Sequence, residues 1–210
     1  MNVFLYVPNV IGYVRLCLLM TSALYCFSDD HSPQLNGLKN LNVFITCYFL
    51  NFVLDGIDGP AARYFDQCTE FGYAFDMILD RIGSSLLFFK LALVFGLKKS
   101  SFGTCASTFW LWCMFLDIGS HWLATLAWPK AHKEAHKTNG SISNRILKCY
   151  YGNLFVVCFF SEISLLSILY GNTFIALLCG PIFAIKTFVN VVQLIESSKQ
   201  LAYKKSEKLI

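Results

Sequence analysis

Residues 54–81 read LDGIDGPAARYFDQCTEFGYAFDMILDR and separate two apolar runs of the chain. The stretch carries six acidic side chains, and four of them form two pairs at helical spacing, Asp55 with Asp58 and Asp76 with Asp80. Residues three or four apart lie on the same face of a helix. Two helices that turn these faces toward each other bring four carboxylates together, and unpaired carboxylates near lipid are costly. The stretch therefore predicts a site for positive charge.

The composition of the whole chain is typical of a membrane protein. Of its 210 residues, 56% are hydrophobic and only 14% are charged, and the mean hydropathy is +0.53. Soluble domains carry about a quarter charged residues, and a membrane-spanning helix needs about 20 mostly apolar residues. We predict an all-α integral membrane protein with six transmembrane helices, in apolar stretches near residues 7–27, 41–54, 72–97, 102–128, 146–170 and 173–195. The chain 1–210 is expected to form one domain with a short basic tail at about 196–210.

The placement of lysine and arginine predicts the orientation in the membrane, because cytoplasmic loops carry an excess of these residues. With six spans, both termini and the loops at 55–71 and 129–145 share one side. That side collects Arg63, Lys130, Lys133, Lys137, Arg145, Lys148, Lys199, Lys204, Lys205 and Lys208, whereas the other side has Lys39, Lys98 and Lys99. Both termini and the acidic stretch are therefore expected to face the cytosol. The net charge of +4 is modest, and no nucleic-acid partner is expected.

The position of the aspartates favours a metal site over a structural role. A single aspartate near a helix end is more often a cap or a solvated loop residue, and we assign Asp66 and Glu70, between the two pairs, to the solvated loop. Asp76 and Asp80 lie inside an apolar stretch, where ionisable side chains usually serve function. Clustered carboxylates suit hard cations such as Mg²⁺, Mn²⁺ or Ca²⁺.

Small residues and one arginine accompany the acids. Gly59 and Gly72 have no side chain, so backbone or a bulky phosphate could approach closely. Arg63 supplies a planar, permanently charged donor suited to phosphate. Together with the carboxylates, these residues indicate a metal-bound diphosphate.

The spacing of these residues resembles the signature of the CDP-alcohol phosphotransferases, D-x-x-D-G-x-x-A-R, eight residues, G-x-x-x-D-x-x-x-D. The chain matches it at Asp55, Asp58, Gly59, Ala62, Arg63, Gly72, Asp76 and Asp80. Within the family, VPNVIGYVRL (7–16), LDIGSHWL (116–123), NRILKCYY (144–151) and AIKTFVNVVQLI (184–195) resemble the eukaryotic phosphatidylinositol synthases. The resemblance implies transfer of a phosphatidyl group from CDP-diacylglycerol to myo-inositol. It also implies a multi-pass protein of the endoplasmic reticulum, its active site toward the cytosol, and a homodimer.

The resemblance also implies a role for each matching residue. Two ions, Mg²⁺ or Mn²⁺, would be bound by the aspartates, and Asp80 would be the general base for an inositol hydroxyl. CDP-diacylglycerol would contact Gly59, Arg63 and Thr69. The ligands implied are Asp55, Asp58 and Asp76 for one ion and Asp55, Asp76 and Asp80 for the other.

Some features leave alternatives open. Lys186 interrupts the last apolar stretch and either snorkels to the cytosolic surface or contributes to the acceptor site. Asn190 and Gln193 are expected to make interhelical hydrogen bonds. For the whole chain, the alternatives are a sibling enzyme that uses another acceptor, such as glycerol 3-phosphate, and a divalent-cation transporter.

Overall fold

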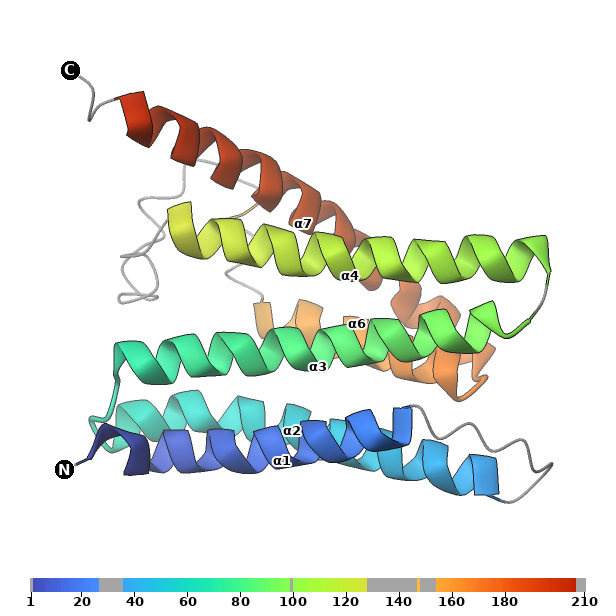
Figure 1. The fold of residues 1–210 in the computed structure, drawn as a ribbon, viewed down its shortest axis with the longest axis horizontal. Helices are drawn as coiled ribbons and strands as arrows, with labels where there is room; N and C mark the ends of the chain where they lie inside the picture. Colours follow the sequence, from blue (N-terminus) through green and yellow to red (C-terminus); the bar gives the residue numbers. More distant parts are fainter. Residues whose placement is uncertain (1, 27–35, 99, 128–146, 148–153, 207–210) are drawn as a thin grey trace. The chain divides into compact units, whose positions relative to one another are not determined.

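A computed structural model of the chain describes residues 2–26, 36–98, 100–127, 147 and 154–206. Within these ranges the regular structure is entirely helical, as predicted (Figure 1). A short 3₁₀ helix, η1 (Val3–Leu5), precedes α1 (Val7–Cys26), α2 (Asn36–Tyr64), α3 (Glu70–Gly96), α4 (Ser101–Ala127), α6 (Leu154–Leu169) and α7 (Thr173–Ser206). The loop expected at 129–145 and most of the segment 144–151 lie outside the described residues.

Polar side chains set the starts of three helices. The Thr69 hydroxyl accepts a hydrogen bond from the backbone N–H of Gly72 at 3.0 Å, and Ser100 accepts one from Gly103 at 3.0 Å. The Asn172 side chain accepts from the N–H of Ile175 at 3.2 Å. Each contact satisfies a backbone donor in the first turn that has no partner within the helix. These caps define where α3, α4 and α7 begin.

Left-handed residues close two of the helices. Asp66 has a φ of 54° just after α2, and Gly171 has a φ of 74° just after α6. At each place the next residue donates back across the last turn, Gln67 to the Ala62 carbonyl at 2.8 Å and Asn172 to that of Ser167 at 2.9 Å. This is the usual C-terminal cap of a helix that reverses direction. Only residues 65–69 therefore connect α2 to α3.

The helices extend further than the apolar runs that suggested them. The sequence predicted a loop at 55–71, but α2 continues to Tyr64 and α3 already begins at Glu70. The assignment of Glu70 to a loop is therefore wrong, whereas Asp66 does lie in the connection. Residues 196–206 of the expected tail continue α7. Helix formation there needs no apolar run, because it depends on the absence of a breaker and on local pairs such as Glu196 with Lys199, 3.3 Å apart.

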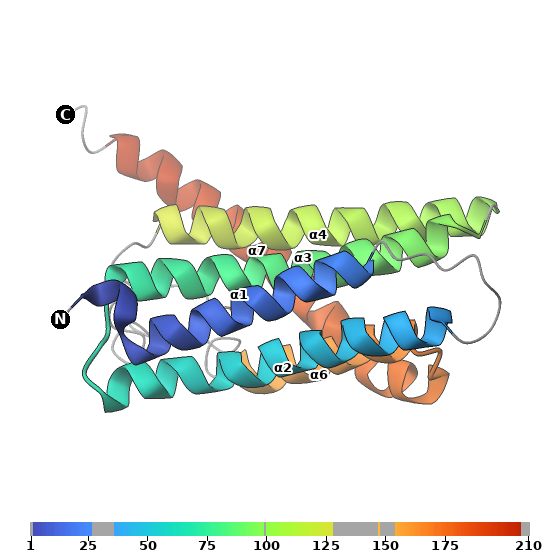
Figure 2. The same cartoon turned by 60° about the horizontal axis from the view of Figure 1, so that its bottom comes forward.

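The first of two compact units comprises residues 1–90. In it α1 packs against α2 (Figure 2), and Gly12 and Gly83 allow α3 a close approach. A Cβ atom on Gly12 would lie 2.6 Å from Cε1 of Phe75, and one on Gly83 would lie 3.5 Å from the amide nitrogen of Asn51. Leu19 and Leu79 are completely or almost completely buried in this unit. The close packing brings side chains of α1 within hydrogen-bonding distance of α2 and α3.

In the second unit, residues 91–210, α7 packs against both α4 and α6. The rings of Trp110 and Phe183 lie 5.8 Å apart between their centroids. The Asn190 amide donates to Oδ1 of Asp117 at 3.0 Å, and Gln193 donates to the Ser120 carbonyl at 3.2 Å. The prediction that these two amides join helices is confirmed.

The distribution of polar and apolar side chains is that of an integral membrane protein. Three described helical segments are long and apolar enough to cross a bilayer: Val7–Cys26, Asn40–Tyr64 and Thr173–Ala202; Val156–Leu169 is shorter. Large apolar side chains face outward, among them Leu24, Trp112 and Leu177. The buried set includes charged and amide side chains: Arg15, Asn51, Asp58, Lys90, Asp117, Glu162, Lys186, Asn190 and Gln193. A lipid environment accounts for this inversion, because it solvates apolar surface and confines polar groups to the interior.

Candidate active site

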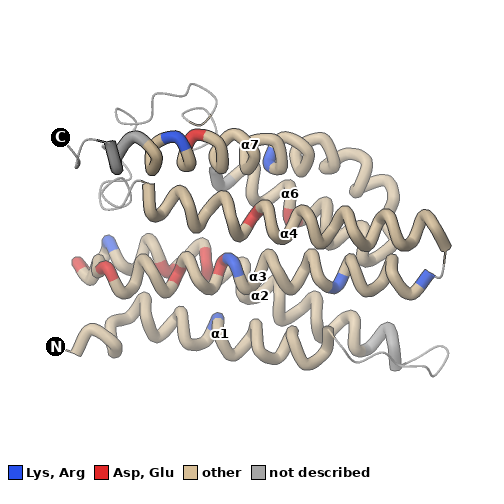
Figure 3. Tube along the Cα trace, turned by 45° about the horizontal axis from the view of Figure 1, so that its top comes forward, with Lys and Arg blue, Asp and Glu red and all other residues tan. Residues whose placement is uncertain are grey.

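The four signature aspartates lie on α2 and α3 of the first unit. Acidic residues gather along these two helices (Figure 3). Asp55 and Asp58 lie near the C-terminal end of α2, whereas Asp76 and Asp80 lie in the first three turns of α3. The capped, five-residue connection turns the chain back, so the acidic end of α2 and the acidic start of α3 meet.

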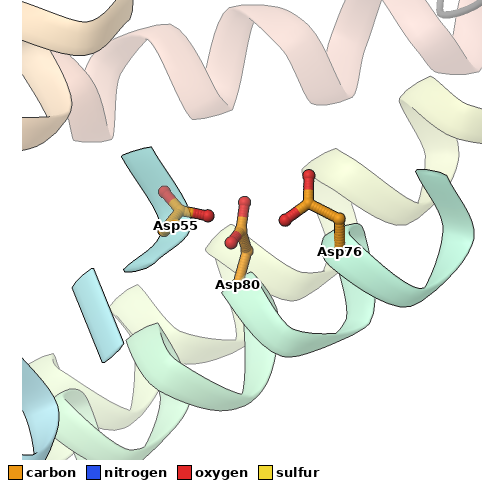
Figure 4. Close-up of side chains that lie close together, drawn as sticks. All are labelled: Asp55, Asp76 and Asp80. Atoms are coloured by element: carbon orange, nitrogen blue, oxygen red, sulfur yellow. The ribbon is translucent and has the colours of Figure 1, made fainter. Parts of the chain in front are cut away.

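Three of the four carboxylates come together in one cluster (Figure 4). Asp55, Asp76 and Asp80 each offer an oxygen, and these oxygens lie within 4.8 Å of one another. Their side chains are 34%, 42% and 33% exposed, so an ion can reach them. All-oxygen donors at this spacing fit a hard divalent cation. Asp58 is not part of this trio and is more deeply buried.

An arginine that the sequence analysis did not consider links all four aspartates. The side chain of Arg15, on α1, is completely buried. Its Nη2 lies 2.7 Å from Oδ1 of Asp55 and 2.7 Å from Oδ1 of Asp80, and its Nη1 lies 2.6 Å from Oδ1 of Asp76. The same Nη1 donates to Oδ2 of Asp58. An arginine in the middle of an apolar stretch was the available signal, because such a residue needs a partner.

Arg15 accounts for only part of the charge and part of the oxygens. It neutralises one of four formal negative charges and contacts one oxygen of each carboxylate. Nη2 of Arg81 lies 3.9 Å from Oδ2 of Asp80, so the cluster has a second, more distant cation. The cluster keeps an excess of negative charge, and three of its four side chains are partly exposed to solvent. Such a cluster attracts further cations.

Gly59 and Arg63 lie on α2, and Gly72 lies on α3. A Cβ atom on Gly59 would lie 3.6 Å from Nη1 of Arg63, so the exposed guanidinium lies near Gly59, one turn away. Gly72 lies at the start of α3, where a Cβ atom would come 3.2 Å from the Thr69 hydroxyl. Thr69 is the N-cap of α3. Its predicted contact with substrate would therefore have to coexist with a structural role.

Lys186 has a buried partner in the second unit. Its Nζ lies 3.3 Å from Oε1 of Glu162, on α6, and both side chains are buried. The alternative in which Lys186 snorkels to the surface is wrong, because the side chain is only 5% exposed. Glu162 was missed in the sequence analysis, although an acid inside an apolar run is itself a signal.

Comparisons with known proteins identify similar chains. The model of the family described as CDP-alcohol phosphatidyltransferase matches residues 5–194. A relative from Candida albicans named CDP-diacylglycerol--inositol 3-phosphatidyltransferase is 30% identical over 211 residues, covering 96% of this chain and 84% of the relative. A relative of the same name from Schizosaccharomyces pombe is 31% identical over 95% of this chain and 90% of its own. For CDP-diacylglycerol--inositol 3-phosphatidyltransferase 1 of Arabidopsis thaliana, the match has 31% identity and covers 76% of this chain but 61% of the relative. No solved structure matches.

Proposed function

The chain belongs to the CDP-alcohol phosphatidyltransferase family, and on that premise we propose that it transfers the phosphatidyl group of CDP-diacylglycerol to myo-inositol and releases CMP. The observation that carries the proposal is the convergence of Asp55, Asp76 and Asp80 in one cluster. Curated relatives from fungi, plants and animals carry names that describe this reaction. Membership in a transferase family argues against a divalent-cation transporter.

In the proposed reaction, a hydroxyl oxygen of inositol bonds to the phosphorus on the lipid side of the diphosphate. The bond from that phosphorus to the bridging oxygen breaks, and the electron pair leaves with CMP. The hydroxyl proton passes to the carboxylate of Asp80, which is held 2.7 Å from Nη2 of Arg15. A fixed carboxylate within reach of the nucleophile is the requirement for general base catalysis.

The four aspartates are proposed to hold two ions, Mg²⁺ or Mn²⁺. Asp55 and Asp76 would bind both ions. Asp58 would be the third ligand of one ion, and Asp80 would be the third ligand of the other. The oxygens of Asp55, Asp76 and Asp80 lie at suitable mutual distances. When bound, such ions stabilise the negative charge that develops on the leaving phosphate.

Arg63, Gly59 and Thr69 are proposed to contact the nucleotide-lipid. The guanidinium of Arg63 is exposed at the end of α2 and supplies donors for a phosphate. Gly59 keeps the neighbouring helix surface small, with room for a Cβ atom in this structure. Thr69 lies at the start of α3.

The partners of the buried cations favour a neutral acceptor. Arg15 contacts the four aspartates, Lys90 donates to the Cys26 carbonyl at 2.8 Å, and Lys186 is paired with Glu162. A phosphorylated alcohol brings about two negative charges, and its site needs several cations that bind the phosphate. A neutral polyol such as myo-inositol needs only hydrogen-bonding groups. The described buried cations therefore support inositol over glycerol 3-phosphate as the acceptor.

We also propose six membrane spans with both termini in the cytosol. At 1.5 Å per residue, the 27 residues of α3 and of α4 each extend about 40 Å, enough for a hydrocarbon core of about 30 Å. Together with α1, α2, α7 and the shorter α6 they supply the six helices of the proposal. The proposed setting is a single catalytic domain in the endoplasmic reticulum, active as a homodimer, with its site toward the cytosol.

The test uses the full chain, purified and reconstituted with CDP-diacylglycerol. CMP release is measured with myo-inositol, with glycerol 3-phosphate and without acceptor, each with Mn²⁺, with Mg²⁺ and with a chelator. We expect release that requires both myo-inositol and a divalent ion, with Asp80→Asn as the inactive control. Equal or faster release with glycerol 3-phosphate would contradict the acceptor assignment, and release in the chelator would contradict the metal assignment.

A further inference from the structure

Arg15 is the one described side chain that contacts all four signature aspartates, and it contacts them from the buried side of the cluster. The guanidinium is completely buried, whereas the side chains of Asp55, Asp76 and Asp80 are 33–42% exposed. Each terminal nitrogen bridges two carboxylates: Nη1 contacts Asp58 and Asp76, and Nη2 contacts Asp55 and Asp80. The planar fork of arginine suits this multiple bridging, which a lysine ammonium reproduces less well.

We propose that Arg15 is a positioning residue, a permanent counter-ion that holds the four aspartates together and stabilises the first unit when no metal is bound. The inference rests on the proposed function, since it concerns the same metal-binding aspartates. It follows from the negative charge of the four aspartates and from the burial of the Arg15 side chain. Four carboxylates from α2 and α3 lie close enough to share one guanidinium, and without it their mutual repulsion would push the two helices apart.

The same contacts make Arg15 an organiser of the proposed metal ligands. The guanidinium contacts one oxygen of each carboxylate and thereby fixes the position of that carboxylate. The carboxylates of Asp55, Asp76 and Asp80 are 33–42% exposed, and each offers an oxygen to a cation within 4.8 Å of the others. A further hydrogen bond, from Nε of Arg15 to Oδ1 of Asn51 at 3.4 Å, anchors the guanidinium to α2. Ligands held by such outer contacts lose less freedom when an ion binds.

The test compares thermal unfolding of the full-length protein in a chelator and in Mn²⁺. Arg15→Gln is expected to lower the melting temperature in the chelator by about 5 °C or more, given the size of the chain. Added Mn²⁺ should recover most of this loss, because the ion neutralises the same carboxylates. A second substitution, Asp58→Asn, should also recover it in the chelator by removing one negative charge. Arg15→Lys, which keeps the charge but not the fork, should melt between Arg15→Gln and wild type.

Lys90→Met is the matched control, because Lys90 is another buried cation of the same unit whose ammonium donates to a backbone carbonyl. Its loss of stability should be the same with and without Mn²⁺. If Arg15→Gln cannot be isolated, Arg15→Lys is measured in its place.

Recovery of the Arg15 variant by Mn²⁺ or by Asp58→Asn supports the inference. An equal loss in both solutions that Asp58→Asn does not reduce would overturn it, as would a melting temperature unchanged in the chelator. If Asp58→Asn recovers the variant while Mn²⁺ stabilises no form of the protein, the counter-ion role of Arg15 stands and the metal part of the proposed function falls.

Discussion

Replacing Lys186 with methionine tests whether its ion pair with Glu162 holds α6 against α7. The ammonium nitrogen lies 3.3 Å from the carboxylate oxygen, and the side chains are only 5% and 9% exposed. Removing one partner of a buried ion pair costs about 3–5 kcal/mol, because the other charge is left without compensation. For a chain of this length the loss corresponds to a fall in melting temperature of about 6–20 °C.

The double variant Lys186→Met, Glu162→Leu separates a packing role from an acceptor role. Replacing both charges by apolar groups is often neutral or stabilising, so we expect the melting temperature to return to within about 3 °C of wild type. Unfolding is followed by intrinsic fluorescence, and CMP release is measured over a range of inositol concentrations. If the pair serves only helix packing, the double variant recovers turnover with an unchanged KM for inositol.

An exposed pair with the same separation provides the control. Lys199 lies 3.3 Å from Glu196, with side chains 60% and 31% exposed. Solvent screens such a pair, so Lys199→Met should change stability by at most about 0.5 kcal/mol. If Lys186→Met has the same melting temperature as wild type, the packing argument is refuted. A stable double variant with a strongly raised KM for inositol would place Lys186 in the acceptor site instead.

Four further predictions concern the site and the fold. Asp80→Asn should reduce CMP release at least about 100-fold, because the amide cannot accept the proton, while circular dichroism stays unchanged; a tenth of wild-type turnover would rule Asp80 out as the base. Gly59→Ala should melt like wild type, since its Cβ would lie 3.6 Å from the nearest side-chain atom outside its chain neighbours, yet it should lose catalytic efficiency with CDP-diacylglycerol. Gly12→Ala, with a Cβ 2.6 Å from Cε1 of Phe75, should instead lose stability, and the reverse order of the two melting temperatures would contradict this packing. In sealed membranes, a reporter cysteine in the C-terminal tail should react from the cytosolic side and one near residues 98–101 should not; labelling of both from one side would contradict six spans.

Much of the site could be predicted from the sequence because its members are close along the chain. Asp55 with Asp58 and Asp76 with Asp80 share helix faces by spacing alone, and the apolar runs around them predict helices in a membrane. The helix boundaries could be predicted less well from the sequence. Hydropathy detects where lipid contact ends. By contrast, α2 ends at Tyr64, just before the left-handed Asp66, and α3 begins directly after the Thr69 cap, and local hydrogen bonds set both boundaries.

Only the tertiary structure decided which distant groups neutralise one another. Arg15 lies 43 residues from Asp58 and 65 from Asp80 along the chain, and Asp117 lies 73 residues from Asn190. The sequence alone determined that each buried charge needs a partner in a low-dielectric interior. It did not determine which partner, because that depends on how the helices pack, and packing at positions such as Gly12 brings α3 against α1. The aspartates could therefore be found in the sequence, but the arginine that holds them together emerged only when the helices were placed side by side.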